Sequence, residues 1–118
     1  MSKVTSKEFD VINIYCSHGA NTANFLKDLG SLARAARPLF IAGDFNLNFL
    51  LDPKPMVVRN ILSNGFKQIV SNPTHIGGGL LDHVYIKRLS FDPKVEVDFP
   101  YYSDHGAVSV FDAKDYLS

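Results

Sequence analysis

The stretch PLFIAGDFN, residues 38–46, places a continuous apolar run directly before a glycine and two polar residues. A short apolar run between proline and glycine is typical of a strand buried on both faces in the middle of a sheet. Asp44 and Asn46 then fall where that strand ends. This stretch therefore predicts both the centre of the fold and a polar rim beside it.

The residues before this strand predict a second strand and a helix. Residues 9–16 (FDVINIYC) are rich in β-branched residues and alternate between two faces, which indicates a mostly buried strand. Residues 22–36 repeat apolar side chains at helical spacing, and Arg34 lies near the end of this helix, where the dipole favours a cation. Residues 1–8 are polar and are expected to be frayed or to lead into the first strand.

The residues after the central strand predict one more helix and then only strands. The helix covers about residues 57–62 and ends at Asn64-Gly65, a pair that favours helix termination. Strands are expected at residues 66–70, 81–87, 95–99 and 106–111. The order β-α-β-α-β-β-β-β predicts an α/β (α+β) fold, with one mixed β-sheet and the helices on one of its faces.

Composition limits the class of protein. A chain of 118 residues fits one domain, and 12 Lys and Arg balance 12 Asp and Glu, which does not favour long-range steering onto nucleic acid. The single cysteine, Cys16, excludes an intrachain disulfide and a multi-cysteine zinc site. The apolar runs are too short to predict a membrane span, and no secretory leader is evident, so an intracellular location is expected.

Polar residues with useful chemistry gather at the predicted strand ends. Carboxylates beside buried strands are costly unless they meet a cation or hydrogen-bond donors, so their convergence at one rim of the sheet would form a site. Each residue also has an ordinary structural interpretation, as a turn aspartate, a strand-edge charge or a hydrogen-bonded histidine. His18 and His75 are expected to be solvated, and Gly77–Gly79 to form a hinge or hairpin tip. The strand-end residues are Asp44, Asn46, Asp82, Asp104 and His105.

Three short motifs together resemble those of the endonuclease/exonuclease/phosphatase superfamily, the metal-dependent phosphodiesterases that include apurinic DNA-repair endonucleases and retroelement endonucleases. They are GDFN at 43–46, LDH at 81–83 and SDH at 103–105. The runs PTHIGGGLLDHVYI (73–86) and YYSDHGAVSV (101–110) look closest to endonuclease domains of eukaryotic mobile elements such as retrotransposons. The resemblance extends from about residue 9 to 112 and rests on the order and spacing of the three motifs.

The resemblance implies a hydrolase that cleaves phosphodiester bonds with an activated water, Mg²⁺ (or Mn²⁺) and DNA as partner. Asp44 would orient or deprotonate the water, and Asn46 would position it or contact the phosphate. Asp82 would hold His105, which would stabilise charge on a phosphoryl oxygen. Tyr15 would donate to the phosphate or the leaving oxygen, and Thr74 and Ser103 would lie on the substrate side. Asp104 would ligate the metal as part of a partial site.

The chain departs from the family in its first half. The family fold is a four-layer α/β sandwich about twice this length, so residues 1–118 are expected to form a single partial domain matching its C-terminal half. The principal metal-ligating glutamate has no counterpart, because Glu8 and Glu96 lie in other settings. The chain is therefore expected to be inactive alone. An apolar sheet face rich in Val, Ile and Phe should be exposed, and should bind an N-terminal half or a second copy.

The sequence is compatible with three functions. The first is a Mg²⁺-dependent DNA endonuclease or its catalytic half, which would act in the nucleus if chromosomal DNA is the substrate. The second is a degenerate, non-catalytic remnant that binds nucleic acid or a partner protein. The third is a phosphatase or phosphodiesterase acting on another phosphate ester. Thr74 and the likeness to mobile elements favour DNA, while the zero net charge favours it less.

Overall fold

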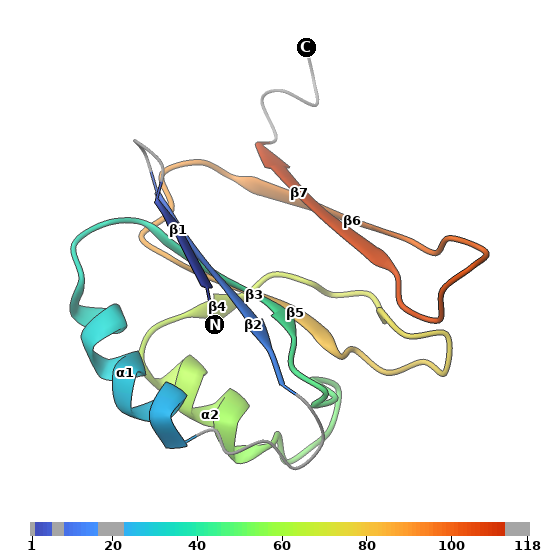
Figure 1. The fold of residues 1–118 in the computed structure, drawn as a ribbon, viewed down its shortest axis with the longest axis horizontal. Helices are drawn as coiled ribbons and strands as arrows, with labels where there is room; N and C mark the ends of the chain where they lie inside the picture. The colour runs from blue at the N-terminus through green and yellow to red at the C-terminus, as the bar shows by residue number, and fades with distance from the viewer. Residues whose placement is uncertain (1, 6–8, 17–22, 113–118) are drawn as a thin grey trace.

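The computed structural model describes residues 2–5, 9–16 and 23–112, so the expectations for Glu8 and His18 lie outside the described residues. Figure 1 shows a central sheet with two helices on one side and a separate strand pair on the other. The helices are α1 (Ala23–Arg34) and α2 (Met56–Ser63). The strands are β1 (Ser2–Thr5), β2 (Asp10–Tyr15), β3 (Leu39–Asp44), β4 (Lys67–Gln68), β5 (Asp82–Lys87), β6 (Pro93–Asp98) and β7 (Ala107–Asp112).

The central sheet is mixed and has the strand order β1-β2-β3-β5-β4. Strands β2 and β3 run parallel, and α1 connects them, as a parallel pair requires a crossover. The pairs β1–β2, β3–β5 and β4–β5 are antiparallel. The predicted central strand is confirmed, because β3 has a neighbour on each side and Ile41 is fully buried. Residues 2–5, predicted to be frayed or a lead-in, form the edge strand β1.

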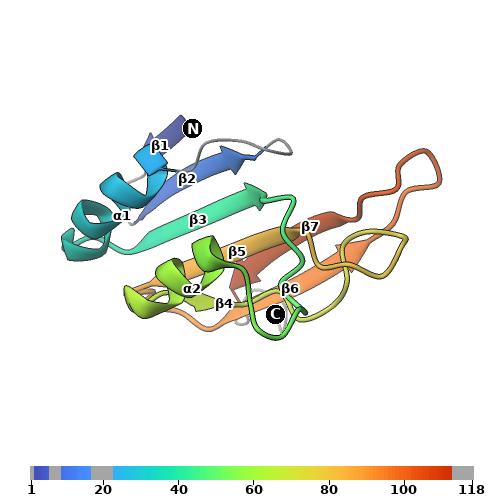
Figure 2. The same ribbon diagram turned by 90° about the horizontal axis from the view of Figure 1, so that it is seen from below.

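Alternation along the strands divides the core between the two faces of the sheet. Ile12, Ile41 and Tyr85 belong to the cluster that includes residues of α1 and α2. Phe40 and Val84, one residue away from these in sequence, belong to the cluster on the opposite face. The mixed α/β class and the placement of the helices on one face are thus confirmed, as both views show (Figures 1 and 2). Within the residues that the structure describes, no helix is long and apolar enough to cross a membrane.

The last two strands form a small sheet of their own, which the expectation of one sheet did not include. Strands β6 and β7 pair antiparallel with each other and with no strand of the five-stranded sheet. In β6, Val95 and Val97 pack into the second core cluster, while the intervening Glu96 is exposed. The strand pair therefore packs through its valines on the sheet face opposite the helices.

The apolar sheet face that was expected to be exposed is partly covered by this strand pair. Phe40 and Val84 of the large sheet lie opposite Val108 and Val110 of β7, and an apolar cavity of about 320 Å³ remains between the two layers. The expectation of a fully exposed apolar face was therefore wrong, because β6 and β7 of the same chain pack against part of that face.

Candidate functional site

Two carboxylates meet at one edge of the central sheet because of its strand register. Asp44 is the last residue of β3 and Asp82 the first of β5, and the antiparallel pairing sets them directly opposite each other. Asp44 is likewise in register with Tyr15 at the end of β2. Asp44 and Asp82 lie two residues from Ala42 and Val84, so by alternation both point to the face covered by β6 and β7.

Gly43 allows the sheet to close just before the first carboxylate. Its φ is +148°, and a Cβ atom at this position would lie 1.8 Å from the backbone oxygen of Ile14. No other residue fits so close to the neighbouring strand without moving the backbone. The fold itself therefore requires glycine at this position of the GDFN motif, whether or not the site is catalytic.

His105 reaches the two carboxylates from the opposite layer. Its Nδ1 lies 2.9 Å from Oδ2 of Asp82, a hydrogen bond, and its Nε2 lies 3.8 Å from Oδ2 of Asp44. The second distance is too long for a direct hydrogen bond. The loop that carries His105 is anchored by the Gly106 amide, which donates to the carbonyl of Thr74 at 2.6 Å. The predicted convergence of Asp44, Asp82 and His105 is present in the structure.

The surroundings of His105 favour its charged form. Its pKa is raised above the ordinary value, first because of the hydrogen bond to Asp82 and then because of the negative charges of Asp82, Asp44 and Asp104. An imidazolium bonded through Nδ1 to Asp82 keeps its Nε2–H directed toward the space beside Asp44. The group can therefore donate a hydrogen bond to an anion at that point.

Asn46 and Tyr15 lie beside this set in different ways. The backbone amide of Asn46 donates to Oδ1 of Asp44 at 2.9 Å, which fixes the carboxylate in a tight turn. The Asn46 side-chain amide donates to the carbonyl of Cys16, so its nitrogen is committed to the end of β2. Tyr15 is 74% exposed, in register with Asp44. Its hydroxyl is accessible to a ligand, whereas the amide nitrogen of Asn46 is engaged with the backbone.

Thr74 and Ser103 position the site from behind. Thr74 is fully buried, and its hydroxyl oxygen accepts hydrogen bonds from the amides of Leu81 (3.0 Å) and Asp82 (2.9 Å). The hydroxyl oxygen of Ser103 accepts from the amide of His105 at 3.1 Å. Both hydroxyls, which the resemblance placed on the substrate side, therefore hold the backbone amides of Asp82 and His105.

Asp104 and His75 form a pair next to the cluster. The exposed carboxylate of Asp104 lies 3.6 Å from Nε2 of His75, and the ring of His75 stands perpendicular to that of His105 with 5.2 Å between centroids. His75 was expected to be solvated, but its side chain is only 31% exposed because its ring packs against that of His105, and the two residues also form a backbone β-bridge. It is the neighbour that sequence reasoning missed, since its partner is distant in the chain and no motif spacing marks it.

The ligand atoms that converge in the described part of the chain belong to Asp44, Asp82 and His105, all within 4.8 Å of one another. Carboxylate oxygens are hard donors that suit Mg²⁺ or Mn²⁺, and Mg²⁺ is commonly held by one or two carboxylates together with a substrate phosphate. Asp44 and Asp82 fit that requirement in part, because one oxygen of Asp82 is bonded to His105. Asp104, the residue that the resemblance implied for the metal, lies outside this set.

The space beside Asp82 can admit a small group. A cavity of about 230 Å³ opens there between the two layers and is lined on one side by Asn13, Ala42 and Gly43, and on the other by Gly106 and Val108. Of these residues, Asn13 carries no motif signal in the sequence. The cavity lies on the face to which both carboxylates point.

Comparison with known proteins adds no further assignment: no family model, curated protein or solved structure matches the chain.

Proposed function

We propose that the cluster of Asp44, Asp82 and His105 hydrolyses phosphodiester bonds with the help of a divalent cation. The observation that carries this proposal is the position of His105, bonded to one carboxylate at 2.9 Å and facing the other at 3.8 Å. A general base and a cationic donor side by side are what the addition of water to a phosphodiester needs. The likeness of the three motifs to those of phosphodiesterases supports the same reaction.

Each residue then has a defined part. Asp44, fixed by the Asn46 amide, accepts the proton of the attacking water. His105 donates its Nε2–H to a phosphoryl oxygen, where charge grows in the transition state. Asp82 holds the imidazole in this orientation and favours its protonated form. Tyr15, exposed at the end of β2, can donate to another phosphate oxygen or to the leaving group.

A divalent cation is needed because the cluster is electronegative. With His105 protonated, the two carboxylates leave it a net charge of −1, which repels a phosphodiester. The cation would be held by Asp44 and Asp82 and would supply charge neutralisation at the phosphate. With so few protein ligands, its affinity would depend on the substrate phosphate. Because the cation would bind weakly, we expect the rate of phosphodiester hydrolysis to keep rising with cation concentration and not to saturate at low concentrations.

DNA is the substrate that we favour, following the likeness to mobile-element endonucleases, and action on chromosomal DNA would take place in the nucleus. The test is nicking of supercoiled plasmid across a series of Mg²⁺ and Mn²⁺ concentrations. The resemblance implied a chain that is inactive alone; we propose instead that a high cation concentration makes up for the missing glutamate, so that the parent protein nicks with a rate that increases over the series. Asp44→Asn should lose this activity about 100-fold or more. Asp92→Asn removes an exposed carboxylate in the segment before β6, and serves as the matched control with unchanged activity.

Two other results would contradict the proposal. Nicking that persists in Asp44→Asn would place the activity elsewhere or in a contaminant. Plasmid binding without nicking at any cation concentration would favour a non-catalytic binding protein instead.

A further inference from the structure

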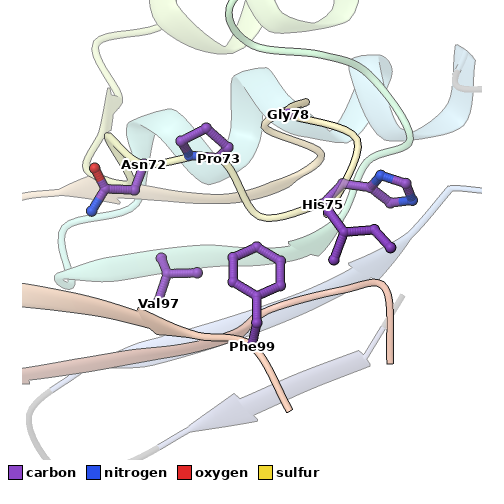
Figure 3. Close-up of a pocket in the computed structure, with 7 residues that line it drawn as sticks. Asn72, Pro73, His75, Gly78, Val97 and Phe99 are labelled. Atoms are coloured by element: carbon purple, nitrogen blue, oxygen red, sulfur yellow. The ribbon is translucent and has the colours of Figure 1, made fainter. Parts of the chain in front are cut away.

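A third cavity, of about 480 Å³, lies next to the candidate site and takes no part in the chemistry described above. Figure 3 shows it between the loop of residues 72–79 and the end of β6, with Val97 and Phe99 directed from the strand toward the loop. The residues that line it are Asn72, Pro73, His75, Ile76, Gly78, Val97 and Phe99.

His75 connects this pocket to the candidate site. Its imidazole is part of the pocket lining, and the same ring contacts that of His105 edge to face at 5.2 Å. The loop and His105 are also joined by the bond from the Ile76 amide to the carbonyl of Asp104, at 2.9 Å. A phosphate held at His105 would therefore bring whatever group it carries directly to the mouth of the pocket.

The lining has the chemistry of a site for an uncharged planar group. Val97, Pro73 and Ile76 are apolar, and Phe99 presents an aromatic ring although 45% of the residue is exposed. Apolar and aromatic surface left open to solvent beside polar groups commonly marks a binding site. The one side-chain amide of the lining, that of Asn72, is exposed and offers both hydrogen-bond donors and an acceptor. None of the lining residues is an aspartate, glutamate, lysine or arginine.

The walls of the pocket are held in place without a ligand. The Gly77 amide donates to Nδ1 of His75 at 3.0 Å, which orients the ring and places the proton of its neutral form on Nε2. The amides of Thr74 and His75 both donate to the carbonyl of Gly79, which closes the loop. On the other side Gly106 lets β6 approach, since a Cβ atom there would lie 2.6 Å from Cγ1 of Val97.

We propose that this pocket is a nucleobase subsite, which takes the base of the nucleotide whose phosphate lies at His105. This inference rests on the proposed function, because that function places the phosphate. A nucleobase is planar, uncharged and edged with donors and acceptors, and aromatic rings bind bases by stacking with little dependence on sequence. Phe99 stacks with or flanks the base, Asn72 hydrogen-bonds its edge, and His75 separates the base from the phosphate.

The test is a fluorescence titration of the full chain with 2-aminopurine deoxyriboside 5′-phosphate, whose emission is quenched on stacking. The parent should quench it, and Phe99→Leu should weaken binding about tenfold. Tyr101→Leu is the matched control, because Tyr101 is a fully exposed aromatic residue outside the lining, and its affinity should equal that of the parent. Circular dichroism of each variant confirms that it is folded.

A parallel assay separates this inference from the proposed function. Diglyceryl phosphate is a phosphodiester without any planar group, so its hydrolysis by the parent, measured as released glycerol, reports the reaction independently of the subsite. Nucleotide binding that depends on Phe99 without hydrolysis of either this ester or plasmid would uphold the subsite and overturn the reaction. Hydrolysis by the parent with nucleotide affinity unchanged in Phe99→Leu, or no nucleotide binding at all, would overturn the subsite.

Discussion

The same dipeptide, Asp-His, occurs at residues 82–83 and 104–105 with opposite outcomes. In the first, the aspartate belongs to the candidate site and His83 is fully buried in the core. In the second, His105 belongs to the site and Asp104 is an exposed partner of His75. The comparison teaches that the position of each residue relative to the sheet, and not its motif, decides its role.

Strand geometry explains the first pair. Asp82 and His83 are consecutive residues of β5, so their side chains point to opposite faces of the sheet. His83 stacks on Phe45 at 4.8 Å, and its ring nitrogens bond to the Tyr85 hydroxyl and to the carbonyls of Leu47 and Leu80. Burial lowers the pKa of His83, so it is held neutral as a structural group.

Loop geometry explains the second pair. Asp104 and His105 precede β7, and their directions are set by the β-bridge to His75 and by the hydroxyl of Ser103. No strand alternation applies there, so a single motif can present its histidine to the site and its aspartate to solvent.

Removing the buried histidine should have the largest effect on stability. His83→Ala deletes a fully buried ring and leaves its partners unsatisfied, so the free energy of unfolding should fall by about 3 kcal/mol in urea denaturation. His105→Ala, in which a partly exposed ring is lost, should lower it by less than about 1 kcal/mol. Equal losses of unfolding free energy would contradict the assignment of His83 to the core and of His105 to the site.

Thr74→Val should have a smaller effect that links the core to the site. Valine has nearly the shape of threonine but leaves the amides of Leu81 and Asp82 without their acceptor, which should cost about 2 kcal/mol. Plasmid nicking should fall as well, because the backbone of Asp82 loses its support. Thr74→Ser keeps the hydroxyl and should restore most of both quantities; a serine variant as impaired as the valine variant would contradict this role.

Much of this arrangement could be predicted from the sequence. The parts that could not be predicted depend on contacts between residues distant in the chain. Asp44 and Asp82 could be predicted as strand-end residues because an apolar strand and its polar end form a local pattern, whereas the register that sets them opposite each other is a long-range contact. The contact of His75 with His105 depends on how a glycine-containing loop folds back, and no periodicity encodes that. The separate β6–β7 sheet was also not predicted, since alternation identifies a strand but not its neighbour.

The contributions of the two histidines to the free energy of unfolding should depend on pH with opposite signs. The pKa of His105 is raised, so its contribution is fully present below about pH 6.5 and is lost as the pH rises through its folded value. The pKa of His83 is lowered, so its contribution is present above about pH 6.5 and is lost as the pH falls through its folded value.

The measurement is a titration of the ring signals by NMR. Asp82→Asn should bring the pKa of His105 down and Asp92→Asn should leave it unchanged, because Asp82 is the first cause of its rise. A His105 that titrates identically in the parent and in Asp82→Asn would show that the pair does not form in solution.

The central claim, that the rim around His105 is a hydrolytic site, is tested most directly by His105→Gln, with plasmid nicking and unfolding free energy measured on the same preparation. The account predicts that nicking falls about 100-fold or more while the unfolding free energy changes by less than about 1 kcal/mol. Nicking that survives in a folded His105→Gln protein would contradict the account.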